Sequence, residues 1–174
     1  MYFLRRTLSV VLTIVVSVVV ASCQGSSERA ATSQPTAASP SIEGTYKLMS
    51  RELPNGTVLR PPKIMGLFTF TKTHRNFNII GEDAGGKFFV STGATYTFTP
   101  TQYCQTQFFN IANDASDRAK AVYDSAEKVV SAPVTITGGR IEFKLPDEPA
   151  FVFQGTTLTA TNKGNFVDVW ERVQ

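Results

Sequence analysis

From Gly44 onward the chain alternates apolar and polar residues in short runs, and this two-residue period constrains the fold more than any other feature. Residues 45–53 and 64–73 both follow it, and Phe68 and Phe70 share one face of the second run. Turn-forming residues such as Pro54-Asn55-Gly56 separate the runs. Because successive side chains of a strand point to opposite faces, the pattern predicts half-buried β-strands. The frequent Phe and Tyr, 13 and 5 residues, agree with this prediction.

Glycine positions refine the strand prediction. Gly138-Gly139 lies between two alternating runs, and two glycines accept the positive φ values of a tight hairpin turn. Gly93 lies inside a run, which predicts a bulge or sharp bend. Many short strands joined by tight turns leave no room for parallel crossovers, and a twisting meander tends to close on itself. The pattern therefore predicts an all-β fold, an antiparallel meander of about nine or ten short strands that tends to close on itself.

Residues 113–130 depart from the alternation. Apolar residues recur there at spacings of three and four, and Asp114 or Ser116 could cap the amino end of a helix. These apolar positions are Ala115, Ala119, Val122, Ala126 and Val129. The stripe is thin and rich in alanine, so the pattern predicts one amphipathic helix inserted in the barrel and lying outside its core.

The first 22 residues have the pattern of a secretory signal peptide. Arg5 and Arg6 precede an apolar run over residues 7–20, which is shorter than the ~20 residues that span a bilayer. The sequence Val20-Ala21-Ser22-Cys23 that follows resembles the bacterial lipobox. This resemblance implies cleavage before Cys23 and lipidation of its sulfur and new amino terminus, and several acyl chains give stable membrane anchoring. The alternatives are an uncleaved anchor and an ordinary secretory cut.

The resemblance also bears on location. Gln24 follows Cys23 where an inner-membrane lipoprotein typically has Asp, which favours the outer membrane in a Gram-negative host. Residues 23–41 are rich in Ser, Thr, Ala, Gln and Pro, a composition typical of a flexible tether. The folded domain is predicted over residues 42–174.

Charge and ligand chemistry exclude two classes of partner. Without Arg5 and Arg6, 15 of the 17 basic residues remain against 14 acidic ones, so we expect no binding to nucleic acid. One histidine and two cysteines are too few for a typical zinc site, and no metal or other cofactor is expected. With Cys23 lipidated, Cys104 has no partner in the chain. A buried, inert thiol is favoured there over a reactive thiol or an intermolecular disulfide.

Four segments in order resemble bacterial lipocalin-like domains: Gly44-Thr45-Tyr46-Lys47-Leu48, Phe70-Thr71-Lys72-Thr73-His74, Gly93-Ala94-Thr95-Tyr96-Thr97-Phe98 and Val169-Trp170-Glu171-Arg172-Val173. The resemblance covers nearly all of residues 42–174. In that family a tryptophan of the first strand stacks under an arginine near the end of the last strand. Tyr46 and Arg172 occupy these positions here, so the resemblance implies that they form a barrel-closing structural pair.

The resemblance implies an antiparallel up-and-down β-barrel of about eight to ten strands, which either encloses a ligand cavity or is filled by its own side chains. If a cavity exists, the inward-facing residues would make a mostly apolar pocket. These pocket candidates are Tyr46, Leu48, Phe68, Phe70, Phe77, Ile79, Tyr96, Phe98, Tyr103, Phe143 and Phe153. Periodicity alone does not separate the two cases, and the aromatic rings could equally fill the interior.

The sequence contains no catalytic motif for dinucleotide, phosphate-loop, zinc-protease or nucleophile-elbow chemistry. His74 lies in a polar run typical of a turn, and the acidic pairs Glu82-Asp83 and Asp147-Glu148 are expected to be solvated. We therefore expect an envelope-anchored lipoprotein that binds a small hydrophobic or amphipathic ligand. The alternatives are a solid-core structural or protein-interaction module and, as a third class, an isomerase- or cyclase-type enzyme using a tyrosine or His74.

Overall fold

The computed structural model describes residues 40–83, 85–114 and 116–173, and within them all regular structure is β-strand. The strands form a single sheet, and every pairing in it is antiparallel. The 13 strands are β1 (Gly44–Glu52), β2 (Val58–Leu59), β3 (Ile64–Phe70), β4 (His74–Asp83), β5 (Gly86–Phe98), β6 (Gln102–Asn113), β7 (Ala121–Asp124), β8 (Lys128–Pro133), β9 (Thr135–Thr137), β10 (Arg140–Lys144), β11 (Ala150–Gln154), β12 (Thr157–Asn162) and β13 (Phe166–Arg172).

The order of strands across the sheet is that of a meander. Neighbours run β7-β6-β5-β4-β3-β1 and then β13-β12-β11-β10-β9, so most strands pair with the next long strand in the chain. The exception is the pairing of β1 with β13, which sets Tyr46 opposite Arg172. The all-β, antiparallel prediction is confirmed. The strand number exceeds the predicted eight to ten because short pieces such as β2 and β7 pair beside longer strands.

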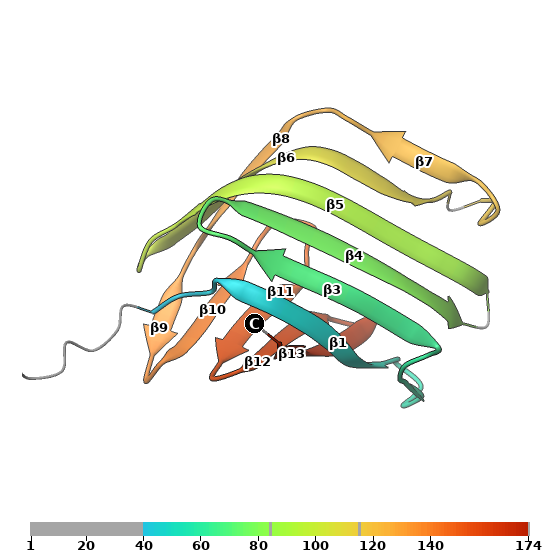
Figure 1. Cartoon of the computed structure of the whole chain (residues 1–174), viewed down its shortest axis with the longest axis horizontal. Helices are drawn as coiled ribbons and strands as arrows, with labels where there is room; N and C mark the ends of the chain where they lie inside the picture. The colour runs from blue at the N-terminus through green and yellow to red at the C-terminus, as the bar shows by residue number, and fades with distance from the viewer. Residues whose placement is uncertain (1–39, 84, 115, 174) are drawn as a thin grey trace, which may run out of the picture. The chain divides into compact units, whose positions relative to one another are not determined.

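The sheet curls until its two sides meet at one end. β8 pairs with β6 and β9 pairs with β10, and only Val134 separates β8 from β9. In Figure 1, β8 leaves β6 at the top of the view and leads down to β9 at the left, beside β10. This bent β8–β9 segment joins the two sides of the sheet, and we call the end where it does so the closed end.

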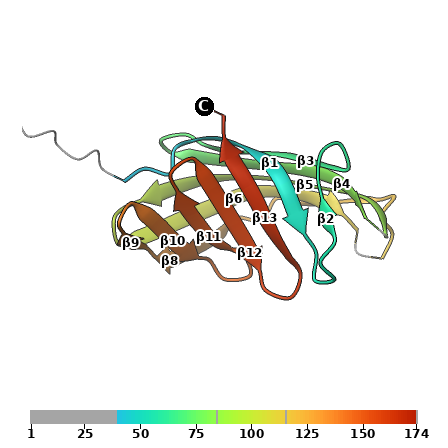
Figure 2. The ribbon, with the colours of Figure 1, turned by 90° about the horizontal axis from the view of Figure 1, so that it is seen from below.

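At the opposite end, the open end, the two sides separate. Residues 110–113 of β6 pair with β7, and the far edge of β7 has no strand partner within residues 40–83, 85–114 and 116–173. Seen from below in Figure 2, β10 to β13 cross in front of β3 to β6. Among the described residues, no helix has the length and apolar character needed to span a bilayer.

The prediction of a helix over residues 113–130 is wrong. That segment contains the end of β6, a turn, β7 and the start of β8. Asp114 Oδ1 does accept hydrogen bonds from the amides of Ser116 and Asp117, as a helix cap would, but the amide of Asp114 binds the carbonyl of Lys120 and closes a turn. Val122 and Val129 are exposed, so the alanine-rich stripe gains little by packing. Pairing with β6 satisfies backbone groups that a surface helix would leave at an open edge.

Two local predictions from glycine are confirmed. Gly138 and Gly139 have φ values of 56° and 81° and connect the β9–β10 hairpin. The β5–β6 register shifts between Gly93 and Ala94, which is the predicted irregularity. A Cβ atom at Gly93 would lie 2.4 Å from the Phe109 ring, so this bulge needs glycine for space rather than for a positive φ.

Candidate functional site

Aromatic rings fill the closed end of the curled sheet. Six of them form a contiguous set that we call the ring cluster: Tyr46, Phe70, Tyr96, Tyr103, Phe143 and Phe153. Tyr103 and Phe143 stack with ring centroids 4.4 Å apart, and Tyr103 also stacks on Tyr96 at 5.4 Å. All six side chains are buried. These predicted pocket residues therefore pack against one another rather than line a space.

Tyr46 and Arg172 meet at the same end. The guanidinium carbon of Arg172 lies 5.3 Å from the Tyr46 ring centroid, and Arg172 Nη2 donates to the Tyr46 hydroxyl at 2.9 Å. That hydroxyl in turn donates to the carbonyl of Ile42 at 3.1 Å. Burial raises the pKa of Tyr46, and the Arg172 guanidinium opposes the rise. The contact ties the entry of the domain to its last strand.

A cavity of about 420 Å³ lies between the ring cluster and the open end. Its apolar wall includes Phe68, Phe77, Val90, Val130, Phe151, Ala160, Phe166 and Trp170. Of the predicted pocket residues, Phe68 and Phe77 line it. Leu48 and Ile79 are buried in the core, and Phe98 is half-buried against it. Pockets of this size commonly hold one small molecule.

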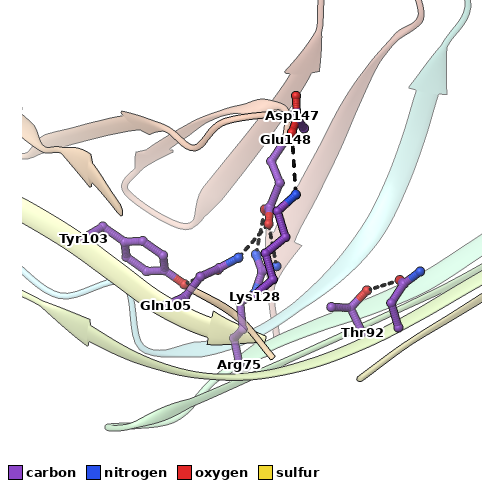
Figure 3. A network of polar contacts seen from close by, with 8 residues as sticks. Arg75, Thr92, Tyr103, Gln105, Lys128, Asp147 and Glu148 are labelled. Carbon is purple, nitrogen blue, oxygen red and sulfur yellow. Dashed lines mark hydrogen bonds and ion pairs between the residues drawn. The ribbon is translucent and has the colours of Figure 1, made fainter. Parts of the chain in front are cut away.

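A buried polar network crosses the cavity (Figure 3). Arg75, on β4, is 5% exposed, and its two Nη atoms donate to the two carboxylate oxygens of Glu148 at 3.0 Å each. Gln105, on β6, donates from Nε2 to Glu148 at 2.6 Å and accepts from the Tyr103 hydroxyl at 3.2 Å. Glu148 belongs to the turn between β10 and β11, so its carboxylate clamps this turn onto the opposite side of the sheet.

A second ion pair lies nearer the open end. Arg51 donates to both carboxylate oxygens of Asp168, at 2.6 and 2.7 Å, and its guanidinium carbon lies 4.0 Å from the Phe166 ring centroid. Burial raises the pKa of Asp168, and the hydrogen bonds from Arg51 act in the opposite direction. Burial also raises the pKa of Tyr103, whose hydroxyl therefore stays a proton donor to Gln105.

The polar residues of this site were missed by sequence reasoning, although part of the signal is visible. Arg75 shares the inward face of its strand with Phe77, as the two-residue period requires. Gln105 likewise alternates with its neighbours on β6 and is buried. The expectation that Asp147-Glu148 is simply solvated is wrong for Glu148. No local sequence pattern indicates that Glu148 is part of the site, because its carboxylate binds residues more than forty positions away in the sequence.

His74 and Cys104, considered from the sequence as an acid–base group and as a thiol, lie away from the cavity wall. His74 is exposed at the start of β4, where its Nδ1 lies 2.8 Å from Thr73 Oγ1. Cys104 is half-buried on β6 and is a free thiol. Among the described residues, no group of three or more His, Cys, Asp or Glu side chains is placed to hold a metal ion.

The candidate site is thus a cavity with a mostly apolar wall and a few polar groups, crossed by the Arg75–Glu148 pair. Cys23 and the predicted signal peptide lie outside the described residues. Comparison of the chain with family models, with curated proteins and with solved structures gave no match.

Proposed function

We propose that this domain binds one small amphiphilic molecule in the cavity, as a lipocalin-like carrier would, without transforming it. The observation that carries the proposal is the cavity of about 420 Å³, which combines an apolar wall with a few converging polar groups. This combination is typical of small-molecule sites, where apolar surface supplies affinity and polar groups fix orientation.

The packing around the cavity supports a preformed site. The ring cluster lies behind the cavity wall, and Phe68 connects the two by stacking on Phe70 with ring centroids 4.4 Å apart. Trp170 is fully buried and packs against Phe68 and Phe77. A ligand entering such a site orders few additional side chains, so less of its binding free energy is lost to conformational entropy.

The first test looks for the ligand directly. The full chain carrying Cys23→Ser, which cannot accept a lipid at that position, is purified without detergent and examined by native mass spectrometry. We expect a co-purified molecule, or uptake of an added amphiphile with one-to-one stoichiometry. Protein that stays empty after several extraction conditions and takes up no amphiphile would refute the carrier proposal.

A cavity-filling variant localises the binding. Ala160 is buried and lines the cavity, so Ala160→Phe should abolish uptake by occupying the space. Thr159 is the neighbouring residue of β12 and points to the other face, so Thr159→Phe is the matched control and should bind normally. Equal uptake by both variants, each shown to be folded by circular dichroism, would place binding elsewhere.

The anchoring part of the proposal rests on the sequence. Lipidation of Cys23 would hold the domain at a membrane of the cell envelope, with the tether over residues 23–41 between them. Cys23→Ser should move the protein from the membrane fraction to the soluble fraction. Unchanged membrane association of this variant would contradict lipidation.

A further inference from the structure

The charges around the cavity are unbalanced toward the negative. Six charged side chains line it, and four of them are carboxylates. The carboxylates are Asp124, Asp147, Glu148 and Asp168, and the cations are Arg75 and Lys128. Arg51 stands behind Asp168, and even when it is included the wall carries no excess positive charge at neutral pH.

Each cation at the cavity is already engaged by a carboxylate. Both Nη atoms of Arg75 are bound to Glu148, and Arg51 is bound in the same two-pronged way to Asp168. Lys128 Nζ lies 3.5 Å from Asp147 at the exposed rim. Within the part of the chain that the structure describes, each cation of the wall thus has a carboxylate partner with which an anionic ligand would have to compete. Moving an unpaired carboxylate from water into such a site is costly.

Uncharged hydrogen-bonding groups are plentiful on the same wall. Thr92, Gln105, Gln107 and Asn110 contribute hydroxyl and amide groups from β5 and β6. The Thr92 hydroxyl donates to Asn110 Oδ1 and Gln105 Nε2 donates to Glu148, so among the described residues the amides of Gln107 and Asn110 are the neutral donors left for a ligand. In addition, Arg75 Nε is buried and has no hydrogen-bond partner among the described residues. A neutral oxygen could accept from these donors without disturbing the Arg75–Glu148 pair, whereas a carboxylate would compete with Glu148 for the same guanidinium.

On the basis of the proposed function, we propose that the ligand is an amphiphile with an uncharged polar head, an alcohol or amide, and that Glu148 excludes fatty-acid-like anions by holding Arg75. The apolar chain contacts Phe77 and Trp170, and the head contacts the hydroxyl and amide groups of β5 and β6. Glu148 is therefore a specificity-determining residue.

The test compares three probes with the same apolar chain. Decanol, decanamide and decanoate are titrated by calorimetry at neutral pH into the full chain carrying Cys23→Ser. We expect the two neutral probes to bind at least about tenfold more tightly than decanoate. Decanoate binding as tightly as the neutral probes, or more tightly, would overturn the charge selectivity and leave the carrier proposal standing. Saturable binding of none of the three would refute the carrier proposal itself.

A charge-removing variant assigns the selectivity to its residue. Glu148→Gln keeps a hydrogen-bonding side chain beside Arg75 and releases the positive charge, so the affinity for decanoate should rise roughly tenfold while decanol changes little. Glu171→Gln removes the same charge from an exposed position of β13 and should change neither. Equal behaviour of the two variants would contradict the role of Glu148. The ranking of probes on the unsubstituted cavity decides the proposal even if Glu148→Gln folds poorly.

Discussion

The two ends of this curled sheet differ in what fills the space inside it, although the same strands build both. At the closed end the inward positions carry rings that stack on one another, and the interior is solid. Beside these rings the same strands place Arg75, Thr92 and Gln105 inward, and the interior there is a cavity that is bridged by a charge pair and extends toward the open end. The comparison teaches that one curled sheet can have a filled interior in one part and a hollow interior in another. One half supplies stability and the other half supplies a site.

The largest expected effect is the loss of a ring from the closed end. Phe153 is 3% exposed and contacts Tyr46, Phe70 and Phe143, so Phe153→Ala should lower the free energy of unfolding by about 3–5 kcal/mol. Phe166→Ala, at the half-buried cavity wall, should cost only about 1–2 kcal/mol. Guanidinium denaturation measures both. Equal losses would show that the two ends are packed alike.

A smaller loss of stability is expected when the ion pair between Arg75 and Glu148 is broken. Glu148→Ala leaves the Arg75 guanidinium buried without its carboxylate and should cost about 2–3 kcal/mol, because Glu148 is 22% exposed and water replaces part of the pair. Replacing both partners, Arg75→Met with Glu148→Leu, should cost less than the single change. A double variant less stable than Glu148→Ala would mean that the pair contributes more than apolar packing can.

Much of the fold and little of the site could be predicted from the sequence. The two-residue period and Gly138-Gly139 identify strands and a hairpin because these depend on neighbours in the chain. The helix over residues 113–130 was predicted in error because spacing does not reveal that the β6 edge needs a partner. The Arg75–Glu148 contact joins a strand to a distant turn, so it depends on the curl of the whole sheet.

The closed end should respond to alkaline pH. Burial raises the pKa of Tyr96 to about 12, above the value near 10 of an exposed tyrosine. The folded state therefore binds the proton of the Tyr96 hydroxyl more tightly than the unfolded state does. The resulting contribution to the free energy of unfolding is fully present below pH 10 and is lost as the pH rises from 10 toward 12. Thermal unfolding in this window should show a falling midpoint, and Tyr96→Phe should flatten the fall. Phenolate absorbance at pH 10 that is smaller in native Tyr96→Phe than in the native unsubstituted protein would contradict the burial argument, because the difference reports on Tyr96 alone.

The smallest effect is expected at the open end in acid. Arg118 donates a hydrogen bond to Asp83 at 2.6 Å, and this bond holds the pKa of Asp83 below its usual value. Because Asp83 has a lower pKa in the folded state than in the unfolded state, its ionised carboxylate stabilises the fold at pH values above the unfolded-state pKa. This stabilisation is lost as the pH falls through the folded-state pKa. The pair is largely solvated, so Asp83→Asn should lower the stability at neutral pH only slightly and make the loss of stability in acid slightly shallower. A loss as large as that of Phe153→Ala would reverse the comparison between the ends.

The pairing of β1 with β13 has a practical consequence for reporters and tags. Tyr46 lies opposite Arg172 and the amide of Val173 binds the carbonyl of Thr45, so the domain is entered and left at the same place. A fluorescent protein fused after the last strand would emerge beside the segment that leads back to the proposed anchor. Arg172 and Val173 do not line the cavity, whereas an insertion between Pro146 and Pro149 would interrupt the cavity wall itself.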